Sequence, residues 1–575
     1  MTTPRTRGAA GAAVLVVSTA WACTSGVAPE ETADAIYHGG DIVTVNDAQP
    51  TAEAVAVQDG KILAVGARSK IEGAHQGEST RLVDLDGHTL LPGFIDAHGH
   101  LKNVGFQVLS ADLLAPPDGT VTSIADLQEK LREWEKGPVH EKMGWIIGFG
   151  YDDAQLKEQR HPTRDDLDEV SKDKPVLVIH QSGHLYAANS VLLELVGITG
   201  ETEDPPGGVI RRRAGSREPD GVLEETALAP VLGAFPKLTG ADQRKMVEAG
   251  VESYARFGFT TACEGRAFPS DIALYAEMAD AGQLVLDVIA YPDYWLGKDA
   301  VKDSPWLSRQ YRNHFRIGGV KGNLDGSPQG KTAWLTQPYH VPPEGRDADY
   351  VGYPMLEEEQ ALAMFDEAYA NGWQIINHAN GDAALDQMIR AARVATEKHG
   401  PGDRRTVGIH SQTVREDQLD AYKELGIIPS FFGMHTFYWG DWHRDSVLGP
   451  ERAAFISPAK AALDRGLVYT QHHDAPVALP SSIAILATQV NRTTRSGEVL
   501  GPDQRVSSLD AIRSVTINAA YQYFEEGSKG SIEPGKLADL VILDRNPLGV
   551  DPGELFDLQV LETIKEGETI YTRSE

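Results

Sequence analysis

Short alternating stretches of apolar and polar residues stand near both ends of the chain and predict β-strands there. Near the N-terminus they are AIYHGGDIVTV, AEAVAVQDGKILAVG and TRLVDLDGHTLLPG, the second with a hairpin turn at Asp59-Gly60. Near the C-terminus they are GSIEPGKLADLVILD and VLETIKEGETIYTR, the latter turning at Glu566-Gly567. Because neither end holds a complete sheet, we expect one small β-sandwich built from residues 35–91 and 526–575.

The region between them, residues 92–525, alternates strand-like and helix-like patterns, which is typical of βα units and a parallel sheet. Eight stretches have the composition of buried strands: Leu90–His98, Phe259–Glu264, Leu284–Tyr291, Phe315–Asn323, Trp373–His378, Arg405–Ser411, Gly426–Phe432 and Leu467–Asp474. Amphipathic runs such as ADQRKMVEAGVESYARFG and EEEQALAMFDEAYANG separate them. The pattern predicts an α/β fold of the (β/α)8 TIM-barrel type, whose chemistry lies at the carboxyl ends of the strands. A long insert, about residues 101–258, follows the first strand and needs structure of its own.

Composition narrows the partners and the metal ligands. The 575 residues include 53 Lys+Arg and 83 Asp+Glu, a formal net charge of -30, which disfavours nucleic acid and anionic membrane surfaces as partners. The two cysteines, Cys23 and Cys263, offer neither a disulfide framework nor a cysteine-type zinc site. A metal would have to be held by His, Asp, Glu or Lys. The sequence leaves the oligomeric state open, a homo-oligomer included.

The first 22 residues have the pattern of a secretory signal. Arg5 and Arg7 precede the apolar stretch Ala9–Val17, which is too short to span a membrane. The segment AWAC resembles a bacterial lipoprotein signal that is cut before Cys23, which implies a lipid on that cysteine and a linker over residues 23–34. We therefore predict an exported bacterial protein, either periplasmic or attached to the membrane through lipidated Cys23.

Two histidines one residue apart end the first predicted barrel strand, in PGFIDAHGH. Alternate residues of a strand face the same side, so His98 and His100 point together from its carboxyl end. Such a pair suits a divalent metal such as zinc, which takes nitrogen ligands at about 2.0–2.1 Å. On its own the motif is equally compatible with two core or surface histidines, so further ligands are needed.

Further metal-ligating side chains lie on or at the ends of later strands. Lys321 lies on the fourth strand, His378 ends the fifth, His410 lies at the end of the sixth and Asp474 ends the eighth. In this order the residues resemble the amidohydrolase superfamily. SGHLYAANSVLLELVGI, PDGVLEETA and KGNLDGSPQGKTA are similar to its family 3, the YtcJ-like branch that includes an N-substituted formamide deformylase. The resemblance implies two divalent ions, expected to be Zn²⁺, with the ligands His98, His100, Lys321, His378, His410 and Asp474, and with Lys321 carbamylated as the bridge between the ions.

Each ligand assignment has a structural alternative. His378 could cap the helix that begins near Asp382, and His410 could be a hydrogen-bonded core histidine. Lys321 is the least ordinary choice, because an ammonium has no lone pair and is costly to bury. Its alternative is a salt bridge to Asp325.

Three more residues are weaker candidates: Glu264, His472 and His473. On a strand, His473 should face away from Asp474. His472 shares the side of Asp474, but the family pattern needs no histidine there, so neither histidine enters the predicted ligand set.

The predicted function is hydrolysis of a carbon–nitrogen bond in a small-molecule amide, such as an N-acyl or N-formyl amine. A metal-bound hydroxide would attack the carbonyl, with Asp474 as general acid/base. His184 in HQSGHLYAANS is a second catalytic candidate, because family members carry a histidine in this motif near the active site; hydrogen bonding within the loop is the alternative. No nucleophile elbow, dinucleotide loop or P-loop motif supports a competing mechanism. A mononuclear deaminase or ester hydrolase on the same barrel, and a catalytically inactive binding lipoprotein, stay open.

Overall fold

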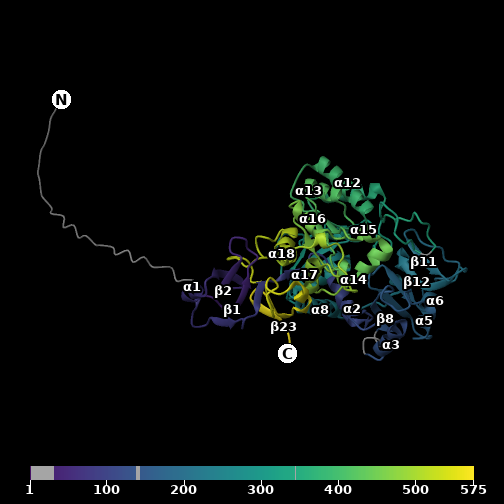
Figure 1. The fold of residues 1–575 in the computed structure, drawn as a ribbon, viewed down its shortest axis with the longest axis horizontal. Coiled ribbons are helices and arrows are strands. Elements are labelled where there is room, and N and C mark those ends of the chain that lie inside the picture. The colour runs from purple at the N-terminus through teal and green to yellow at the C-terminus, as the bar shows by residue number, and fades with distance from the viewer. Residues whose placement is uncertain (2–31, 138–142, 344, 575) are drawn as a thin grey trace.

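The computed structural model describes Met1 and residues 32–137, 143–343 and 345–574. Apart from Met1, the predicted signal peptide lies outside the described residues, and so does Cys23. Within the described part of the chain, no helix is both long and apolar enough to cross a membrane. The N-terminal strands, in purple, and the C-terminal strands, in yellow, lie toward one end of the molecule, and the strands of the insert lie toward the other (Figure 1).

Eight strands from the two ends of the chain form one sheet. They are β1 (Ala35–Val43), β2 (Thr51–Gln58), β3 (Lys61–Gly66), β4 (Arg81–Asp84), β5 (Thr89–Pro92), β21 (Leu540–Leu543), β22 (Val560–Lys565) and β23 (Glu568–Thr572). Their order is β23-β22-β21-β5-β1-β2-β3, and β4 pairs with β1. The two chain ends meet where β5 pairs antiparallel with β21, with Leu90 opposite Ile542 and Leu91 opposite Val541.

The two faces of this sheet pack against different cores, because successive side chains of a strand point to opposite faces. Leu91 and Val541 belong to the large core cluster that also contains Phe259 of the central strands. Leu90 and Ile542 belong instead to a separate cluster within the terminal segments. One face therefore packs on the central region, and the other covers a smaller core.

Nine central strands lie parallel to one another. Most of the candidate site residues lie on these strands or shortly after their carboxyl ends. They are β6 (Phe94–Ile95), β13 (Phe259–Ala267), β14 (Asp287–Pro292), β15 (Phe315–Ile317), β16 (Gly319–Asn323), β17 (Gln374–Ala379), β18 (Val407–His410), β19 (Ile428–Phe431) and β20 (Thr470–Gln471). Neighbours follow chain order in two sheets, β6-β13-β14-β15 and β16-β17-β18-β19-β20, and only Gly318 separates β15 from β16. Beyond the other ends of these sheets, the Asp474 amide donates to the His98 carbonyl at 3.2 Å, and the His100 amide donates to the Ala475 carbonyl at 2.8 Å. The segments that follow the first and the last strand are therefore adjacent.

Helices separate the strands along the chain. They are α1 (Arg68–His75), α2 (Leu101–Leu109), α3 (Ile124–Trp134), α5 (Arg164–Asp168), α6 (Ser190–Leu195), α7 (Ala229–Ala234), α8 (Gly240–Arg256), α9 (Pro269–Asp280), α10 (Tyr294–Gly297), α11 (Glu358–Ala370), α12 (Asp382–His399), α13 (Glu416–Leu425), α14 (His435–Trp442), α15 (Pro450–Ala453), α16 (Ala459–Asp464), α17 (Ser482–Asn491), α18 (Ser508–Ser514) and α19 (Ile517–Gln522). In α8 the Thr239 side chain caps the first turn, and Met246, Val247, Gly250 and Tyr254 form one buried face. That spacing is the amphipathic pattern of a helix packed on a core.

The insert contains a sheet of its own, in the order β11-β12-β10-β9-β8-β7. Its strands are β7 (Ala111–Asp112), β8 (Ile146–Tyr151), β9 (Val176–His180), β10 (Leu185–Ala188), β11 (Gly208–Arg212) and β12 (Pro219–Glu225). Two apolar clusters, one with Val178 and one with its neighbour Leu177, pack on opposite faces. The flanking helices α2 and α8 pack against each other and contribute to the core of the central region.

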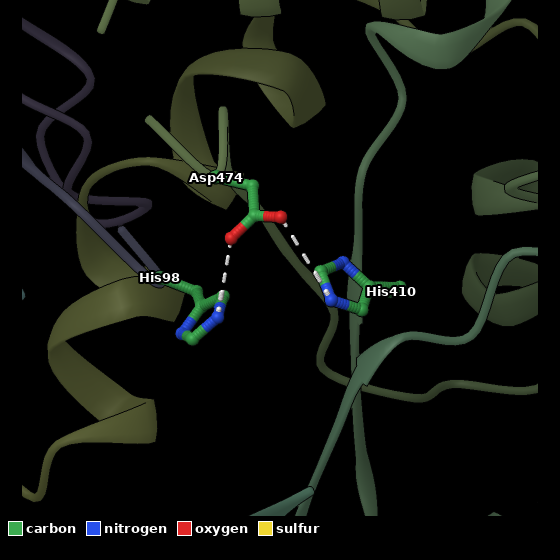
Figure 2. Close-up of side chains that lie close together, drawn as sticks. All are labelled: His98, His410 and Asp474. Carbon is green, nitrogen blue, oxygen red and sulfur yellow. Dashed lines mark ion pairs between the residues drawn. The ribbon is translucent and has the colours of Figure 1, made fainter. Parts of the chain in front are cut away.

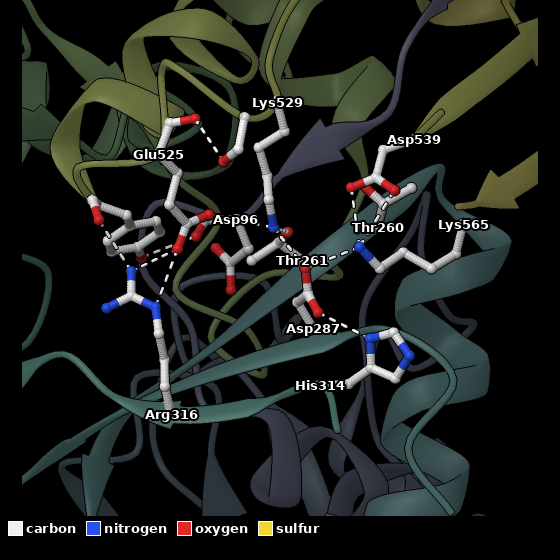
Figure 3. Close-up of polar contacts among 12 residues, drawn as sticks. Asp96, Thr260, Thr261, Asp287, His314, Arg316, Glu525, Lys529, Asp539 and Lys565 are labelled. Carbon is white, nitrogen blue, oxygen red and sulfur yellow. Dashed lines mark hydrogen bonds and ion pairs between the residues drawn. The ribbon is translucent and has the colours of Figure 1, made fainter. Parts of the chain in front are cut away.

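A buried ion-pair network joins the C-terminal segment to the central strands (Figure 3). Asp287, the first residue of β14, accepts hydrogen bonds from Lys529 and from Lys565, whose Nζ is 2.7 Å from Asp287 Oδ2. Lys565 Nζ also lies 3.0 Å from Asp539 Oδ2. Burial opposes the charged form of Lys565, but attraction by Asp287 and Asp539 outweighs burial and raises its pKa. These charges are therefore stable in the interior only as a group.

Removing one cation of this network should destabilise the fold. Lys565→Met leaves two buried carboxylates with one partner fewer, so we expect the free energy of unfolding to fall by about 3–5 kcal/mol, the usual cost of breaking a buried pair. Urea denaturation followed by circular dichroism measures the change. Lys398→Met, which removes an exposed pair with Asp366, is the control and should cost less than about 1 kcal/mol. Equal losses in the two variants would contradict a stabilising role for the network.

Candidate metal centre

Two imidazoles that follow β6 point at one carboxylate oxygen. Nε2 of His98 and Nε2 of His100 each lie 3.3 Å from Oδ1 of Asp474. The two rings are steeply inclined to each other, with centroids 5.1 Å apart. His98 is fully buried and Asp474 is 9% exposed, whereas His100 is partly exposed. The alternate spacing in the sequence thus brings both nitrogens to one point.

The Asp474 carboxylate lies between His98 and His410, as Figure 2 shows, with Oδ2 3.9 Å from Nε2 of His410. Oδ1 is buried and has no hydrogen-bond donor among the described residues. In tetrahedral coordination, ligand atoms at zinc's usual bond length of about 2.0–2.1 Å lie about 3.3 Å from one another. The separations at Oδ1 therefore fit ligands of a shared ion, and the donor set of imidazole and carboxylate suits zinc.

Backbone strain marks two of these positions. His410 has a φ of 73° and Asp474 a φ of 51°, a left-handed conformation that residues other than glycine seldom adopt. Such strain costs about 1–3 kcal/mol per residue and is concentrated at functional sites, where the surrounding structure enforces it. Both residues stand at or just after the carboxyl end of a parallel strand. The fold therefore holds these two facing side chains in place at an energetic cost.

A chain of hydrogen bonds sets the ring orientations of His378 and His410. Nε2 of His378 lies 3.0 Å from the Gly326 carbonyl, so it carries the proton and leaves a lone pair on Nδ1. That Nδ1 is 3.0 Å from Nε2 of His410. Nδ1 of His410 lies 3.1 Å from Nε2 of His472, whose Nδ1 lies 3.0 Å from the Ser430 hydroxyl. Because Nδ1 of His378 can only accept, the hydrogen bond between the two rings needs a proton on Nε2 of His410. A cation bound between the rings would replace that proton, with Nδ1 of His410 then donating to His472, as in metal-ligating histidines.

The charge state of these rings agrees with that arrangement. Burial, together with the nearby Lys321 and the neighbouring imidazoles, holds the pKa values of His378 and His410 well below the usual histidine value. Burial and Lys321 have the same effect on the pKa of His98. At neutral pH the three rings are therefore uncharged, which is the form that binds a cation. His378 does not cap α12, whose N-cap is Gly381, and the Gly381 amide donates to Asp325.

Lys321 lies on β16 with its Nζ 3.0 Å from Nε2 of His98. Burial lowers the pKa of Lys321 to about 7, so much of it is the neutral amine near neutral pH. The alternative partner, Asp325, instead accepts the backbone N–H groups of Trp334, Asn380 and Gly381. In the described ranges no ion pair joins Lys321 to Asp325. The structure therefore places the amine against the histidines and not against that acid.

His184 reaches the same region from the insert. Its Nδ1 lies 3.0 Å from both carboxylate oxygens of Glu225, which is the last residue of β12. Burial would lower the pKa of His184, but Glu225 outweighs burial and raises it. His184, His378, His410 and Asp474 line one small cavity. The His184 ring is thus available to a group bound beside the metal ligands.

The weaker candidates lie around the centre. Glu264 accepts the Tyr275 hydroxyl, and its carboxylate is 3.8 Å from Nδ1 of His100 on the side away from Asp474. His473 faces away from Asp474, as predicted, with its Nε2 3.3 Å from Asp96. Two supporting residues, Glu225 and Ser430, are not among the candidates from the sequence, and a third, His472, is only a weak one there. His472 does have a signal in the sequence, because it lies two residues before Asp474 in the predicted strand, although β20 ends at Gln471.

Several known proteins are similar to this chain in sequence and in fold. The sequence profile of the amidohydrolase family matches residues 81–571. The chain is 27% identical to the YtcJ protein of Bacillus subtilis (strain 168), over 94% of this chain and 100% of that protein. It is also 27% identical to the N-substituted formamide deformylase of Arthrobacter pascens, over 94% of this chain and 99% of the relative.

A solved structure extends the likeness to three dimensions. An uncharacterized metal-dependent hydrolase from Pyrococcus horikoshii OT3 superposes with a TM-score of 0.71 at 26% identity, covering 90% of this chain and 99% of that one. Together with the sequence matches, it confirms the resemblance that the motifs indicated.

Proposed function

This chain belongs to the amidohydrolase family and has a TIM-barrel-type α/β fold, and on that premise we propose that it hydrolyses carbon–nitrogen bonds in small amides with the help of bound metal. One observation carries the proposal: Oδ1 of Asp474 lies 3.3 Å from two imidazole nitrogens and has no described hydrogen-bond donor. The N-substituted formamide deformylase among the relatives supports an N-formyl or N-acyl amine as the substrate class.

We propose that two divalent ions, best matched by Zn²⁺, bind here. Their ligands would be His98, His100, Lys321, His378, His410 and Asp474. When bound, such ions lower the pKa of a coordinated water to about 7 and polarise a carbonyl oxygen. Lys321 would serve through a carbamate formed with carbon dioxide, because only its neutral amine reacts and burial lowers the pKa of that amine to about 7.

The chain's own residues would then move the proton and bind the substrate. Asp474 is placed to accept a proton from the attacking water and to donate it to the leaving amine nitrogen. His184, whose protonated form Glu225 favours, can in that form donate a hydrogen bond to the substrate oxygen from across the small cavity. The products are a carboxylic acid and an amine.

The regions around the site have proposed roles as well. We infer that the central strands close into a (β/α)8 barrel over residues 92–525, supported by the backbone hydrogen bonds between the segments after β6 and β20. Residues 35–91 and 526–575 would form the accessory β-sandwich, supported by the pairing of β5 with β21. The insert, about residues 101–258, would form one wall of the substrate site, supported by the position of His184.

We also propose that the protein is exported. Residues 1–22 would be removed as a signal peptide, and Cys23, at the start of a linker over residues 23–34, would carry a lipid that attaches the protein to the membrane. The support is the order of Arg5, Arg7, an apolar stretch and AWAC in the sequence.

Loss of the Lys321 side chain should remove the bridge between the ions. We expect Lys321→Ala to lose most of its bound metal and activity, and bicarbonate to promote metal reconstitution of the stripped wild type, because carbamate formation needs carbon dioxide. Metal analysis by mass spectrometry measures the ion content. Lys331→Ala is the control, since Lys331 is also buried but its ammonium donates, within the described residues, to Val341 and Ser446 and to none of the proposed ligands. Full metal content in Lys321→Ala would rule out the bridge, and one ion with an unmodified lysine in the wild type would favour a mononuclear enzyme.

The second functional prediction tests turnover. Asp474→Asn keeps the size and one oxygen ligand but cannot accept the proton, so kcat should fall about 10²- to 10⁴-fold. KM should change little, because proton transfer belongs to the transition state. The measurement uses the metal-loaded protein and the N-acyl or N-formyl amine that the wild type hydrolyses fastest, with the exposed Asp503→Asn as control. A wild-type rate in Asp474→Asn at equal metal content would contradict the mechanism, and no turnover of any such amine by the wild type would contradict the function.

The third prediction concerns export. Expressed in a bacterium with its leader, the wild type should mature at Cys23 and sediment with membranes. Cys23→Ser should move it to the soluble fraction, because serine cannot carry the thioether-linked lipid. Fractionation, immunoblotting and N-terminal mass spectrometry decide the outcome. A soluble but processed wild type would refute the anchor alone, and an intact Met1 on a cytoplasmic product would refute export.

A further inference from the structure

A second cluster of possible metal ligands lies in the insert, apart from the centre around Asp474. It consists of Asp152 and Asp153, which follow β8, His161 in the loop that comes next, and His180 at the end of β9. We call these four residues the insert cluster. Asp152, His161 and His180 are buried, and Asp153 lines a cavity of about 1010 Å³ together with both histidines.

The ligand atoms of the insert cluster converge. Nε2 of His180 lies 3.1 Å from Asp153 Oδ1 and 3.7 Å from Asp152 Oδ1. Nε2 of His161 lies 3.5 Å from the other oxygen of Asp153. These separations bracket the spacing of about 3.3 Å that tetrahedral zinc ligands have, and two of them are too long for hydrogen bonds. In the metal-free chain, burial opposes the charged form of His180, but Asp152 and Asp153 outweigh burial and raise the pKa of His180 to about 9. A divalent cation would displace that proton, and two carboxylates with two neutral imidazoles would then balance its charge.

Outer contacts fix the orientation of three of these side chains. Nδ1 of His180 lies 2.8 Å from the Ser182 hydroxyl and accepts the Ser182 amide at 3.0 Å, and Nδ1 of His161 lies 3.2 Å from the Tyr151 hydroxyl. The indole N–H of Trp439, on α14, donates to Asp152 Oδ2 at 2.8 Å. Ligating histidines and carboxylates are oriented by such second partners in known metal sites.

A third cluster provides a contrast within the same chain. Nδ1 of His314 lies 2.9 Å from Asp287 and 3.8 Å from Glu566, so three possible ligands also meet there. However, two lysine ammonium groups already neutralise Asp287 (Figure 3). In the described ranges, no lysine or arginine forms an ion pair with either aspartate of the insert cluster. The nearby Arg211 pairs with Glu224 instead.

We propose that the insert cluster is a second divalent-cation site, best suited to Zn²⁺. An ion there would orient His184, because the Ser182 hydroxyl contacts His180 and also accepts the His184 amide at 3.2 Å. Through Asp152 and Trp439 the same ion would fasten the insert to α14. Metal binding at the insert cluster can be tested separately from the proposed hydrolysis, since the cluster shares no ligand with the centre around Asp474.

Zinc content tests the site when the first centre is disabled. The full-length double variant His98→Asn/His100→Asn is stripped with a chelator, dialysed against Zn²⁺ and analysed by mass spectrometry. We expect it to retain about one ion per chain, and to lose that ion when Asp153→Asn and His180→Gln are added, because a site of this kind needs all its ligands. His314→Gln, in the cluster that lysines neutralise, is the matched control and should leave the zinc content unchanged.

Two results would overturn the proposal. One is a double variant that is folded by circular dichroism yet binds no zinc, and the other is unchanged zinc content after loss of Asp153 and His180. If the double variant does not fold, wild type and Asp153→Asn are compared directly, and equal zinc content would also overturn it. Each of these experiments measures bound zinc, whereas the proposed hydrolysis is tested by turnover. Failure of one proposal can therefore be distinguished from failure of the other.

Discussion

The carboxylate of Asp474 is the acid on which the described site depends, because it contacts three buried or partly buried imidazoles at once. Burying several basic groups together is unfavourable unless they are neutral or share a counter-charge. Burial accordingly lowers the pKa of His98 far below its usual value and that of Lys321 to about 7. At neutral pH the rings of His98 and His410 therefore face the carboxylate with lone pairs and not with positive charges, and such an environment attracts a cation.

The carboxyl ends of the parallel strands meet at the site, which brings the histidines and Asp474 together. The backbone of Asp474 donates to the His98 carbonyl, so the segments after the last and the first strand are joined at the site itself. His410 and Asp474 take the left-handed conformation there, which core packing of the strands behind them must support. The buried network around Asp287 lies at the opposite, amino end of β14, so the strands are fixed by charge pairs at one end and left free for chemistry at the other.

The candidate ligands could be predicted from the sequence because each lies near the end of an apolar run and because their order resembles that of a known family. His98 and His100 come shortly after the first run, although β6 already ends at Ile95, and His378 and Asp474 stand where later runs stop. The supporting residues do not follow from local rules. His472 acts through the pairing of β18, β19 and β20, and Glu225 lies 41 residues from the His184 ring that it holds. The last strand also ends earlier than its apolar pattern predicts, because the chain leaves the sheet before Asp474.

Glu225 shows how the insert and the central region share one site. Its carboxylate holds His184 and also accepts the hydroxyl of Thr332, which lies after β16. Asp152 and Trp439 make a second polar contact between the insert and the loops beyond the central strands. Hydrogen bonds are directional and lose strength steeply when misaligned. The position of His184 relative to Asp474 is therefore set by a few polar contacts and not by apolar packing alone, so a small change at these contacts would alter the space between the two side chains.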